Sequence, residues 1–174
     1  MDRVRVSVHP ASLPEEELLR RCRLVRERGG GPGGQHRNRV STGARYLHEP
    51  TGVEAHADER RSAEENRRAA LRRLRLELAV RVRTPIAAGE CRTGLWRSRC
   101  TPEGRIVCNA RHPDFPALLS EALDVIEACD LDVRRAALRL ACTPSQLVGL
   151  LQDHPEAWAT LNRRREAAGL RALR

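Results

Sequence analysis

The chain has 174 residues, enough for one medium-sized domain or two small ones, and its formal net charge is +9. The basic excess indicates a polyanionic partner, most simply a nucleic acid. It lies mainly in residues 1–84, which carry 19 Arg and 12 acidic residues, against 13 and 11 in residues 85–174. All 32 basic residues are Arg, which we attribute to codon bias in a GC-rich genome. Only four residues are aromatic, so contacts to phosphate and sugar are expected rather than base stacking on an aromatic sheet.

The N-terminus lacks the apolar core of a secretory signal, and no apolar run approaches the length of a membrane span. We therefore expect a cytoplasmic protein with reduced thiols, no cofactor and no membrane partner. A zinc set is conceivable, but its C-x8-C-x7-C-x3-H spacing matches no compact zinc knuckle, so thiols without metal are favoured. Its members would be Cys91, Cys100, Cys108 and His112.

The first predicted elements form a small antiparallel sheet. Alternating valines predict a short strand or an extended arm over residues 4–8, and Pro14 with three following Glu residues opens a short helix. Strands are predicted over residues 22–28, 44–48 and 53–57. The last two are joined by a turn with Pro at its second position and Gly at its fourth, Glu49-Pro50-Thr51-Gly52. Residues 29–41 form a Gly-rich polar loop.

A long helix is predicted to follow the sheet. It begins at Ser62, which forms a capping box with Glu65, and the dipeptide Thr84-Pro85 ends it. Its arginines have two interpretations, a solvated face and a phosphate-facing stripe, and the sequence leaves both open. These arginines are Arg67, Arg68, Arg72, Arg73 and Arg75, and the apolar stripe of the helix consists of Ala70, Leu71, Leu74, Leu78 and Val82.

The C-terminal half is predicted to be mostly helical. Residues 85–112 are mixed in character, with a possible hairpin around residues 101–104. Apolar stripes over residues 118–126 and 133–141 predict two helices, Thr143-Pro144 opens a third, and a last helix runs from Asp153 or His154 to near Gly169.

Residues 133–151 have the spacing of a helix-turn-helix. The presumed second helix has no basic residue and only Ser145 and Gln146 to read bases, so we favour helix-turn-helix-like packing or a docking role over sequence-specific DNA reading. The fold class expected is α+β: a small antiparallel sheet with a packed long helix and a projecting loop, followed by a small all-α domain. The domains expected are residues 1–84, a linker at 85–112, and residues 113–174.

The most informative motif lies in the predicted loop, Gly31-Pro32-Gly33-Gly34-Gln35-His36-Arg37-Asn38-Arg39. The Gly33-Gly34 pair permits backbone with positive φ and lets a partner approach the main chain closely. Gln35 offers an amide acceptor, two side-chain donors and its own backbone N–H. Such a tip suits insertion into a crowded polyanionic site.

Residues 20–80 resemble the catalytic domain of the class I peptide chain release factor superfamily. The resemblance is carried by the loop motif, by Pro50-Thr51-Gly52, and by Asp58-Glu59-Arg60-Arg61-Ser62 with Asn66-Arg67. It implies a domain that enters the ribosomal peptidyl-transferase centre and hydrolyses the ester between nascent peptide and P-site tRNA. It implies catalytic roles for Gly33, Gly34 and Gln35, whose backbone N–H would stabilise the developing charge while its side chain positions water. The RNA contacts expected are His36, Arg37, Asn38, Arg39, Arg60, Arg61 and Arg67.

No stop-codon-reading segment is recognisable, so the chain resembles the short, codon-independent ribosome-rescue hydrolases. The expected partners are large-subunit ribosomal RNA and P-site peptidyl-tRNA, and the protein is expected to be a monomer. The helical domain is the candidate sensor of the ribosome's state. Two alternatives stay open: a non-catalytic ribosome- or RNA-binding factor, against which the intact Gly33-Gly34-Gln35 argues, and a DNA-binding regulator that uses residues 133–151.

Overall fold

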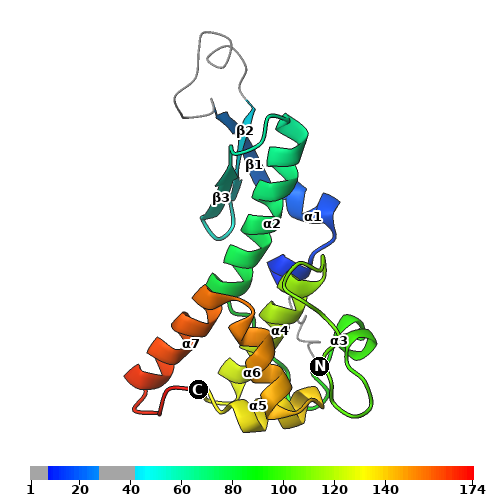
Figure 1. Ribbon diagram of the computed structural model, residues 1–174, viewed down its shortest axis with the longest axis vertical. Coiled ribbons are helices and arrows are strands. Elements are labelled where there is room, and N and C mark those ends of the chain that lie inside the picture. Colours follow the sequence, from blue (N-terminus) through cyan, green and yellow to red (C-terminus); the bar gives the residue numbers. More distant parts are fainter. Residues whose placement is uncertain (1–7, 28–41) are drawn as a thin grey trace, which may run out of the picture.

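The computed structural model describes residues 8–27 and 42–174. Within these ranges the protein is α+β, as predicted, with a three-stranded antiparallel sheet and seven α-helices. Figure 1 shows the sheet beside one end of the longest helix and a cluster of helices at its other end. In chain order the elements are η1 (Pro10–Ser12), α1 (Glu15–Arg20), β1 (Cys22–Glu27), β2 (Gly43–His48), β3 (Val53–Ala57), α2 (Ala63–Arg81), α3 (Gly94–Arg99), α4 (Phe115–Ala128), α5 (Val133–Leu140), α6 (Pro144–Gln152) and α7 (Pro155–Ala167).

The sheet confirms the three predicted strands. Its order is β1-β2-β3, and the first pairing runs from Cys22 opposite His48 to Glu27 opposite Gly43. The predicted turn joins β2 to β3: Gly52 has a φ of +70° and its N–H donates to the His48 carbonyl at 2.9 Å. Glycine adopts this left-handed conformation at little cost, which explains its place in the turn. The strand or arm predicted over residues 4–8 lies, except for its last residue, outside the described residues.

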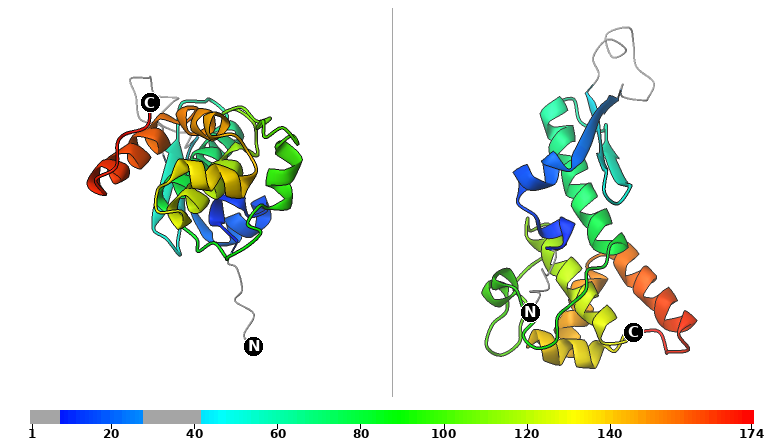
Figure 2. Two further views of the ribbon diagram at one scale, coloured as in Figure 1. Left: turned by 90° about the horizontal axis from the view of Figure 1, so that it is seen from below. Right: turned by 180° about the vertical axis from the view of Figure 1, so that it is seen from behind.

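Helix α2 begins and ends close to where the sequence predicts. The hydroxyl of Ser62 accepts from the Glu65 N–H at 3.4 Å, and the Val82 N–H closes the last turn on the Leu78 carbonyl at 3.0 Å. The apolar stripe is buried against β2, β3 and α4, with Leu74 and Leu78 fully inaccessible. Figure 2 shows α1 and η1 on the side of α2 away from β3. None of the helices within residues 8–27 and 42–174 is long and apolar enough to cross a membrane.

Residues 85–112 hold more regular structure than the linker interpretation implies. They contain α3, which the sequence did not predict, and an isolated bridge between Cys100 and Ile106 that encloses the expected hairpin. The buried Trp96 indole of α3 donates to the Leu140 carbonyl at the end of α5, at 2.8 Å. The segment therefore packs against the helical part of the chain, and the division of the chain at residues 84 and 112 stays a prediction.

The hairpin approaches the α5–α6 turn closely at a glycine. Gly104 has a φ of +79°, and a Cβ added there would lie 3.1 Å from the Cys142 Cα. The Thr143 N–H donates to the Gly104 carbonyl at 3.1 Å. Any larger residue at position 104 would therefore strain its own backbone and push the turn away.

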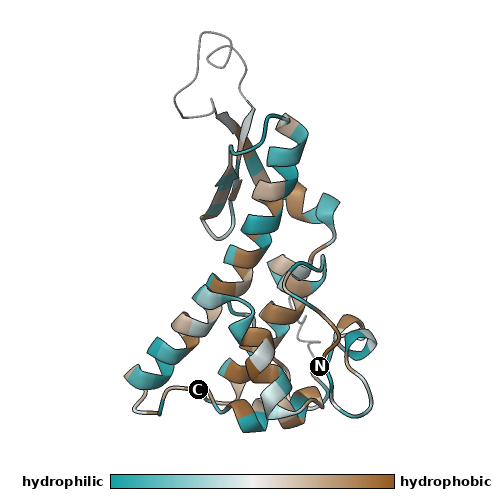
Figure 3. Cartoon of the chain, viewed as in Figure 1, coloured by the Kyte–Doolittle hydropathy of each residue, from teal (hydrophilic) through white to brown (hydrophobic). Residues whose placement is uncertain are grey.

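The helices after residue 113 appear where the periodicity predicts them. Helix α5 ends at Leu140 because Ala141 adopts a left-handed φ of +50°, and Thr143 caps α6 by accepting from the Gln146 N–H at 3.2 Å. Figure 3 shows many hydrophobic residues in α4 and α6, and with the buried face of α5 they form the second part of the core. His154 caps α7, and Gly169 follows it with a φ of +74°.

Candidate functional site at the base of the β1–β2 connection

The most specific predicted site residues lie outside the described residues. They are Gly33, Gly34, Gln35, His36, Arg37, Asn38 and Arg39. The structure does describe the base from which their connection departs and to which it returns. This base consists of the last pair of β1 and β2, Glu27 opposite Gly43, together with Thr42 and the start of α2.

A buried amide organises this base. Asn66 lies in the first turn of α2 and is fully inaccessible. Its Nδ2 donates to the carbonyl oxygens of Thr42 and Arg60, each at 2.9 Å. Its Oδ1 accepts from the Arg60 N–H at 2.9 Å. One side chain thus fixes the main chain just before β2 and the main chain of the β3–α2 loop.

A second contact from α2 holds the same loop. The Arg73 guanidinium forms two hydrogen bonds to the Glu59 carboxylate, at 2.7 and 3.1 Å, and one to the His56 carbonyl at 2.8 Å. Hydrogen bonds to its own backbone, and next to Arg73, hold the pKa of Glu59 below its usual range. The loop between β3 and α2 is therefore fastened at two neighbouring residues, Glu59 and Arg60.

Three of the predicted RNA contacts are described. Arg60 and Arg61 are exposed in this loop, and neither side chain has a hydrogen-bond or ion-pair partner among residues 8–27 and 42–174. Arg67 is half-buried, with its guanidinium 3.7 Å from Glu64. The Arg60–Arg61 pair is therefore the part of the described site with cationic groups directed to solvent.

The other arginines of α2 mostly serve neither of the roles considered from the sequence. Arg75 donates to the carbonyls of Ala11 and Leu13, both at 2.8 Å, and burial lowers its pKa. Arg72 donates to the carbonyls of Ala110 and His112. These guanidinium groups join α2 to distant backbone, so they are structural.

Two buried acids of α4 join it to neighbouring segments, Asp124 to the end of α2 and Glu121 to the start of α3. Asp124 is 2% exposed and accepts from the Arg83 guanidinium at 3.1 Å, the Thr84 N–H at 3.2 Å and the Thr84 hydroxyl. One turn earlier, Glu121 accepts from the N–H and hydroxyl of Thr93 at 2.8 and 2.6 Å. Burial raises the pKa of Glu121. The helical part of the chain is therefore fastened to the end of α2.

Two histidines near these junctions accept hydrogen bonds from backbone N–H groups. His9 Nδ1 accepts from Ala11 at 3.0 Å, and its Nε2 lies 3.1 Å from the Val82 carbonyl. His154 Nδ1 accepts from Ala157 at 3.2 Å. Burial lowers the pKa of both imidazoles, in His9 against the opposing effect of Asp124. Both arrangements require an unprotonated Nδ1 and therefore favour the neutral ring.

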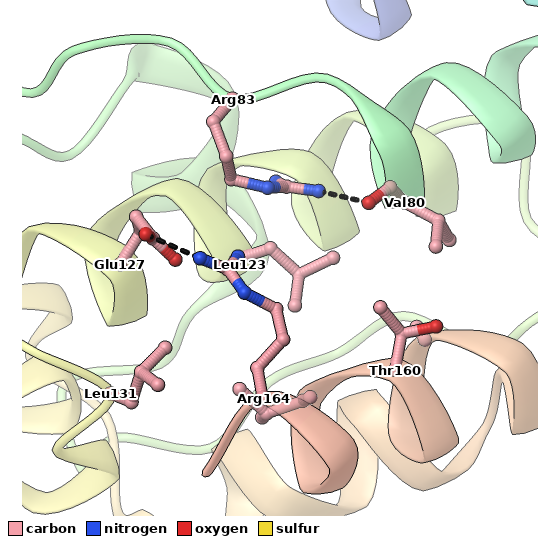
Figure 4. A pocket seen from close by; sticks show the side chains of 9 residues that line it. Val80, Arg83, Leu123, Glu127, Leu131, Thr160 and Arg164 are labelled. Carbon is pink, nitrogen blue, oxygen red and sulfur yellow. Dashed lines mark hydrogen bonds and ion pairs between the residues drawn. The ribbon is translucent and has the colours of Figure 1, made fainter. Parts of the chain in front are cut away.

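A small cleft between α2, α4 and α7 also carries charged groups (Figure 4). Arg164 of α7 pairs with Glu127 of α4 at 2.6 Å, and Arg83 donates to the Val80 carbonyl at 2.5 Å. The first contact fastens α7 to α4, and the second is local to the end of α2. The cleft therefore has a structural explanation.

Groups that two alternatives from the sequence would use have hydrogen-bond partners in the described structure. The Gln146 amide, one of two groups available for base reading, accepts from the Ile106 N–H at 3.0 Å. The Cys91 thiol donates to the Arg139 carbonyl. Among residues 8–27 and 42–174, no three His, Cys, Asp or Glu side chains are grouped as metal ligands.

Sequence reasoning gave Asn66 no role of its own, although a signal was present. Asn66 precedes Ala70, Leu74 and Leu78 at four-residue intervals, so it occupies the buried stripe of α2. A polar residue at such a position must find partners, because an unpaired buried amide is costly. Arg73 gave no comparable signal, since it lies among many arginines.

Comparisons with known proteins are consistent with this geometry. The family model of the RF-1 domain matches residues 15–92. Peptide chain release factor 1 of Frankia casuarinae is 32% identical over 128 residues, covering 63% of this chain and 36% of that protein. Peptide chain release factor 1 of Acidiphilium cryptum is 30% identical over 129 residues, covering 66% and 37%. The chloroplastic peptide chain release factor PrfB1 of Arabidopsis thaliana is 43% identical over 68 residues, covering 39% and 14%. The chain therefore spans little more than a third of the length of the first two relatives.

Proposed function

We propose that this chain, which belongs to the class I peptide chain release factor superfamily, hydrolyses peptidyl-tRNA on the ribosome. The observation that carries the proposal is the match of the RF-1 domain to residues 15–92, a range that includes Gly33-Gly34-Gln35. In the sequence, the described strands β1 and β2 flank the segment that contains this tripeptide. The proposed partners are large-subunit ribosomal RNA and P-site peptidyl-tRNA.

The proposed reaction adds water to the carbonyl carbon of the ester that joins the peptide to the tRNA ribose. The bond to the ribose oxygen breaks, the peptide leaves as a carboxylic acid, and the ribose oxygen takes a proton. In this proposal the backbone N–H of Gln35 donates to the oxygen on which negative charge develops. The Gln35 side chain positions the attacking water, and the RNA surroundings accept its proton.

The Arg60–Arg61 pair is the proposed contact to ribosomal RNA near this site. Both guanidinium groups are exposed and lack partners in the described part of the chain, so binding a phosphate would break no contact of theirs there. Such contacts are independent of sequence and weaken as salt concentration rises. The pair therefore suits docking of the domain rather than the chemical step.

The helical part of the chain is the proposed sensor of the ribosome's state, and release is proposed to need no stop codon. Helices α4 to α7 lie at the end of α2 away from the sheet (Figure 1). The buried Asp124 of α4 fastens them there. A recognition element at this end of α2 would contact one part of the ribosome, while the end of α2 beside the sheet is proposed to act in the large subunit.

The test is peptide release from ribosomes carrying P-site peptidyl-tRNA, with the A site empty, holding a stop codon, or holding a sense codon. We expect release from complexes with an empty A site alone. Gln35→Ala removes the water-positioning amide and is expected to slow release by about 10- to 100-fold. Gln35→Pro removes the backbone donor and is expected to slow it by about 100- to 1000-fold. Both variants should still bind ribosomes.

The arms of this experiment separate the parts of the proposal. Release only with a stop codon would refute codon independence and leave the hydrolase. A wild-type rate of release in both Gln35→Ala and Gln35→Pro would refute the proposed roles of the Gln35 side chain and backbone. Ribosome binding without release from any complex would favour a non-catalytic RNA-binding factor.

A further inference from the structure

We infer that Asn66 is a positioning residue for the proposed hydrolysis. It bonds the main chain of Thr42, where the β1–β2 connection returns to the sheet, and the main chain of Arg60 in the Arg60–Arg61 pair, and so fixes the two segments relative to each other. The inference rests on the proposed function and adds a residue to it. Asn66 contacts neither substrate nor RNA in this view. It acts through the two main-chain segments to which it is bonded.

The hydrogen bonds of Asn66 show why an amide is required. Both donors of Nδ2 are used, one on the Thr42 carbonyl and one on the Arg60 carbonyl, while Oδ1 is used on the Arg60 N–H. A carboxylate of the same shape would keep the acceptor but would set a negative oxygen against two carbonyl oxygens. An apolar residue would leave three partly buried backbone groups without this partner, which is unfavourable.

The segments joined by Asn66 are far apart in sequence and meet only through the fold. The contact to Thr42 spans 24 residues and the contact to Arg60 spans 6. Thr42 stands directly before the first residue of β2, where the connection returns to the sheet. Arg60 and the next residue carry the exposed cationic groups. A displacement of the α2 start would therefore move both segments together.

The neighbouring Arg73 contact strengthens this interpretation. Arg73 fastens Glu59 and the end of β3, one residue before the segment that Asn66 fastens. Neither Arg73 nor Glu59 reaches Thr42. Asn66 is therefore the side chain through which α2 bonds to the return of the connection.

The experiment compares Asn66→Ala and Asn66→Asp with Leu74→Ala in the same release assay on full-length protein. Leu74 is buried two turns further along the same face of α2, so its truncation lowers stability without touching Thr42 or Arg60. Three quantities are measured: the rate of release at saturating protein, the protein concentration giving half of that rate, and hydrogen exchange at the Arg60 amide. Thermal unfolding confirms that each variant is folded at the assay temperature.

We expect both Asn66 variants to release peptide about 10- to 100-fold more slowly at saturation, because displacement by about 1 Å has effects of this size. The protein concentration that gives half of the maximal rate should change less than 3-fold, because loss of positioning slows the chemical step without weakening binding to the ribosome. The Arg60 amide should exchange faster in Asn66→Ala but stay protected in Asn66→Asp, which keeps the acceptor. Leu74→Ala should lose thermal stability and keep the wild-type rate.

Two results would overturn the inference while leaving the hydrolase in place. One is a wild-type rate in either Asn66 variant. The other is an equal loss of rate in Leu74→Ala, which would mean that stability alone governs release. If the wild-type protein releases no peptide from any complex, the proposed function fails, and this inference fails with it. Asn66→Asp preserves the shape of the side chain, so it tests the positioning role even where Asn66→Ala does not fold.

Discussion

Replacing Asp124 by Ala is expected to destabilise the protein strongly. The carboxylate is 2% exposed and accepts from the Thr84 N–H, the Thr84 hydroxyl and the Arg83 guanidinium. Breaking a buried ion pair by removing one partner costs about 3–5 kcal/mol. Arg83 keeps its bonds to the Ala79 and Val80 carbonyls and its side chain is 21% exposed, which places the expected loss near the lower limit, at about 3 kcal/mol.

The measurement is reversible unfolding in urea together with thermal unfolding. For a chain of this size, about 3 kcal/mol corresponds to a fall in Tm of about 6–12 °C. The control is Glu16→Ala, because Glu16 is 90% exposed and its ion pair with Arg20 at 3.7 Å lies in solvent. Its loss should cost less than about 1 kcal/mol. A loss below about 1 kcal/mol for Asp124→Ala would refute the view that this carboxylate fastens α4 to α2.

The remaining predictions concern a glycine and the buried histidines. Gly104→Ala should lower stability more than Gly89→Ala in urea unfolding, because both have positive φ but only Gly104 has backbone within 3.1 Å of the added Cβ; equal losses would contradict the close approach of the hairpin to the α5–α6 turn. Burial lowers the pKa of three imidazoles below 6.5. Below about pH 6.5 the unfolded chain therefore binds more protons than the folded protein, so stability should be full above about pH 6.5 and decline below it. Urea unfolding between pH 7.5 and 5 checks this, and stability that rises on acidification would contradict it. These histidines are His9, His48 and His154.

The sequence predicted the elements whose signals are local. The turn ending in Gly52, the cap at Ser62 and the cap at Thr143 each combine a residue type with a fixed spacing, and all three are confirmed. Helix α3 was missed because its six residues are too few to show a period. Its stability comes from Trp96, whose indole donates to a carbonyl 44 residues away, and no local pattern reports such a partner.

The candidate site likewise has one part that the sequence predicts and another that depends on contacts between distant residues. The tripeptide Gly33-Gly34-Gln35 is a sequence signal, and the family match to residues 15–92 is consistent with it. The described base at Glu27, Thr42 and Gly43 depends on contacts that only the fold creates. Arg73 contacts Glu59 across 14 residues, and Asn66 contacts Thr42 across 24. Composition likewise gave no means to separate Arg72 and Arg75, which bind backbone carbonyls, from arginines exposed to solvent.

Helix α2 acts as a lever because each of its ends is fastened to a different part of the molecule. Its 19 residues extend about 28 Å, with Asn66 at one end and the partners of Asp124 just beyond the other. Asn66 lies about 22 Å from the α4 end of the helix, so a tilt of about 10° there would move Asn66 by about 4 Å, more than the length of a hydrogen bond. Small displacements caused by substitutions in the core around α4 would therefore become larger at the sheet end of α2. The position of that end thus depends on packing among residues that lie far from it.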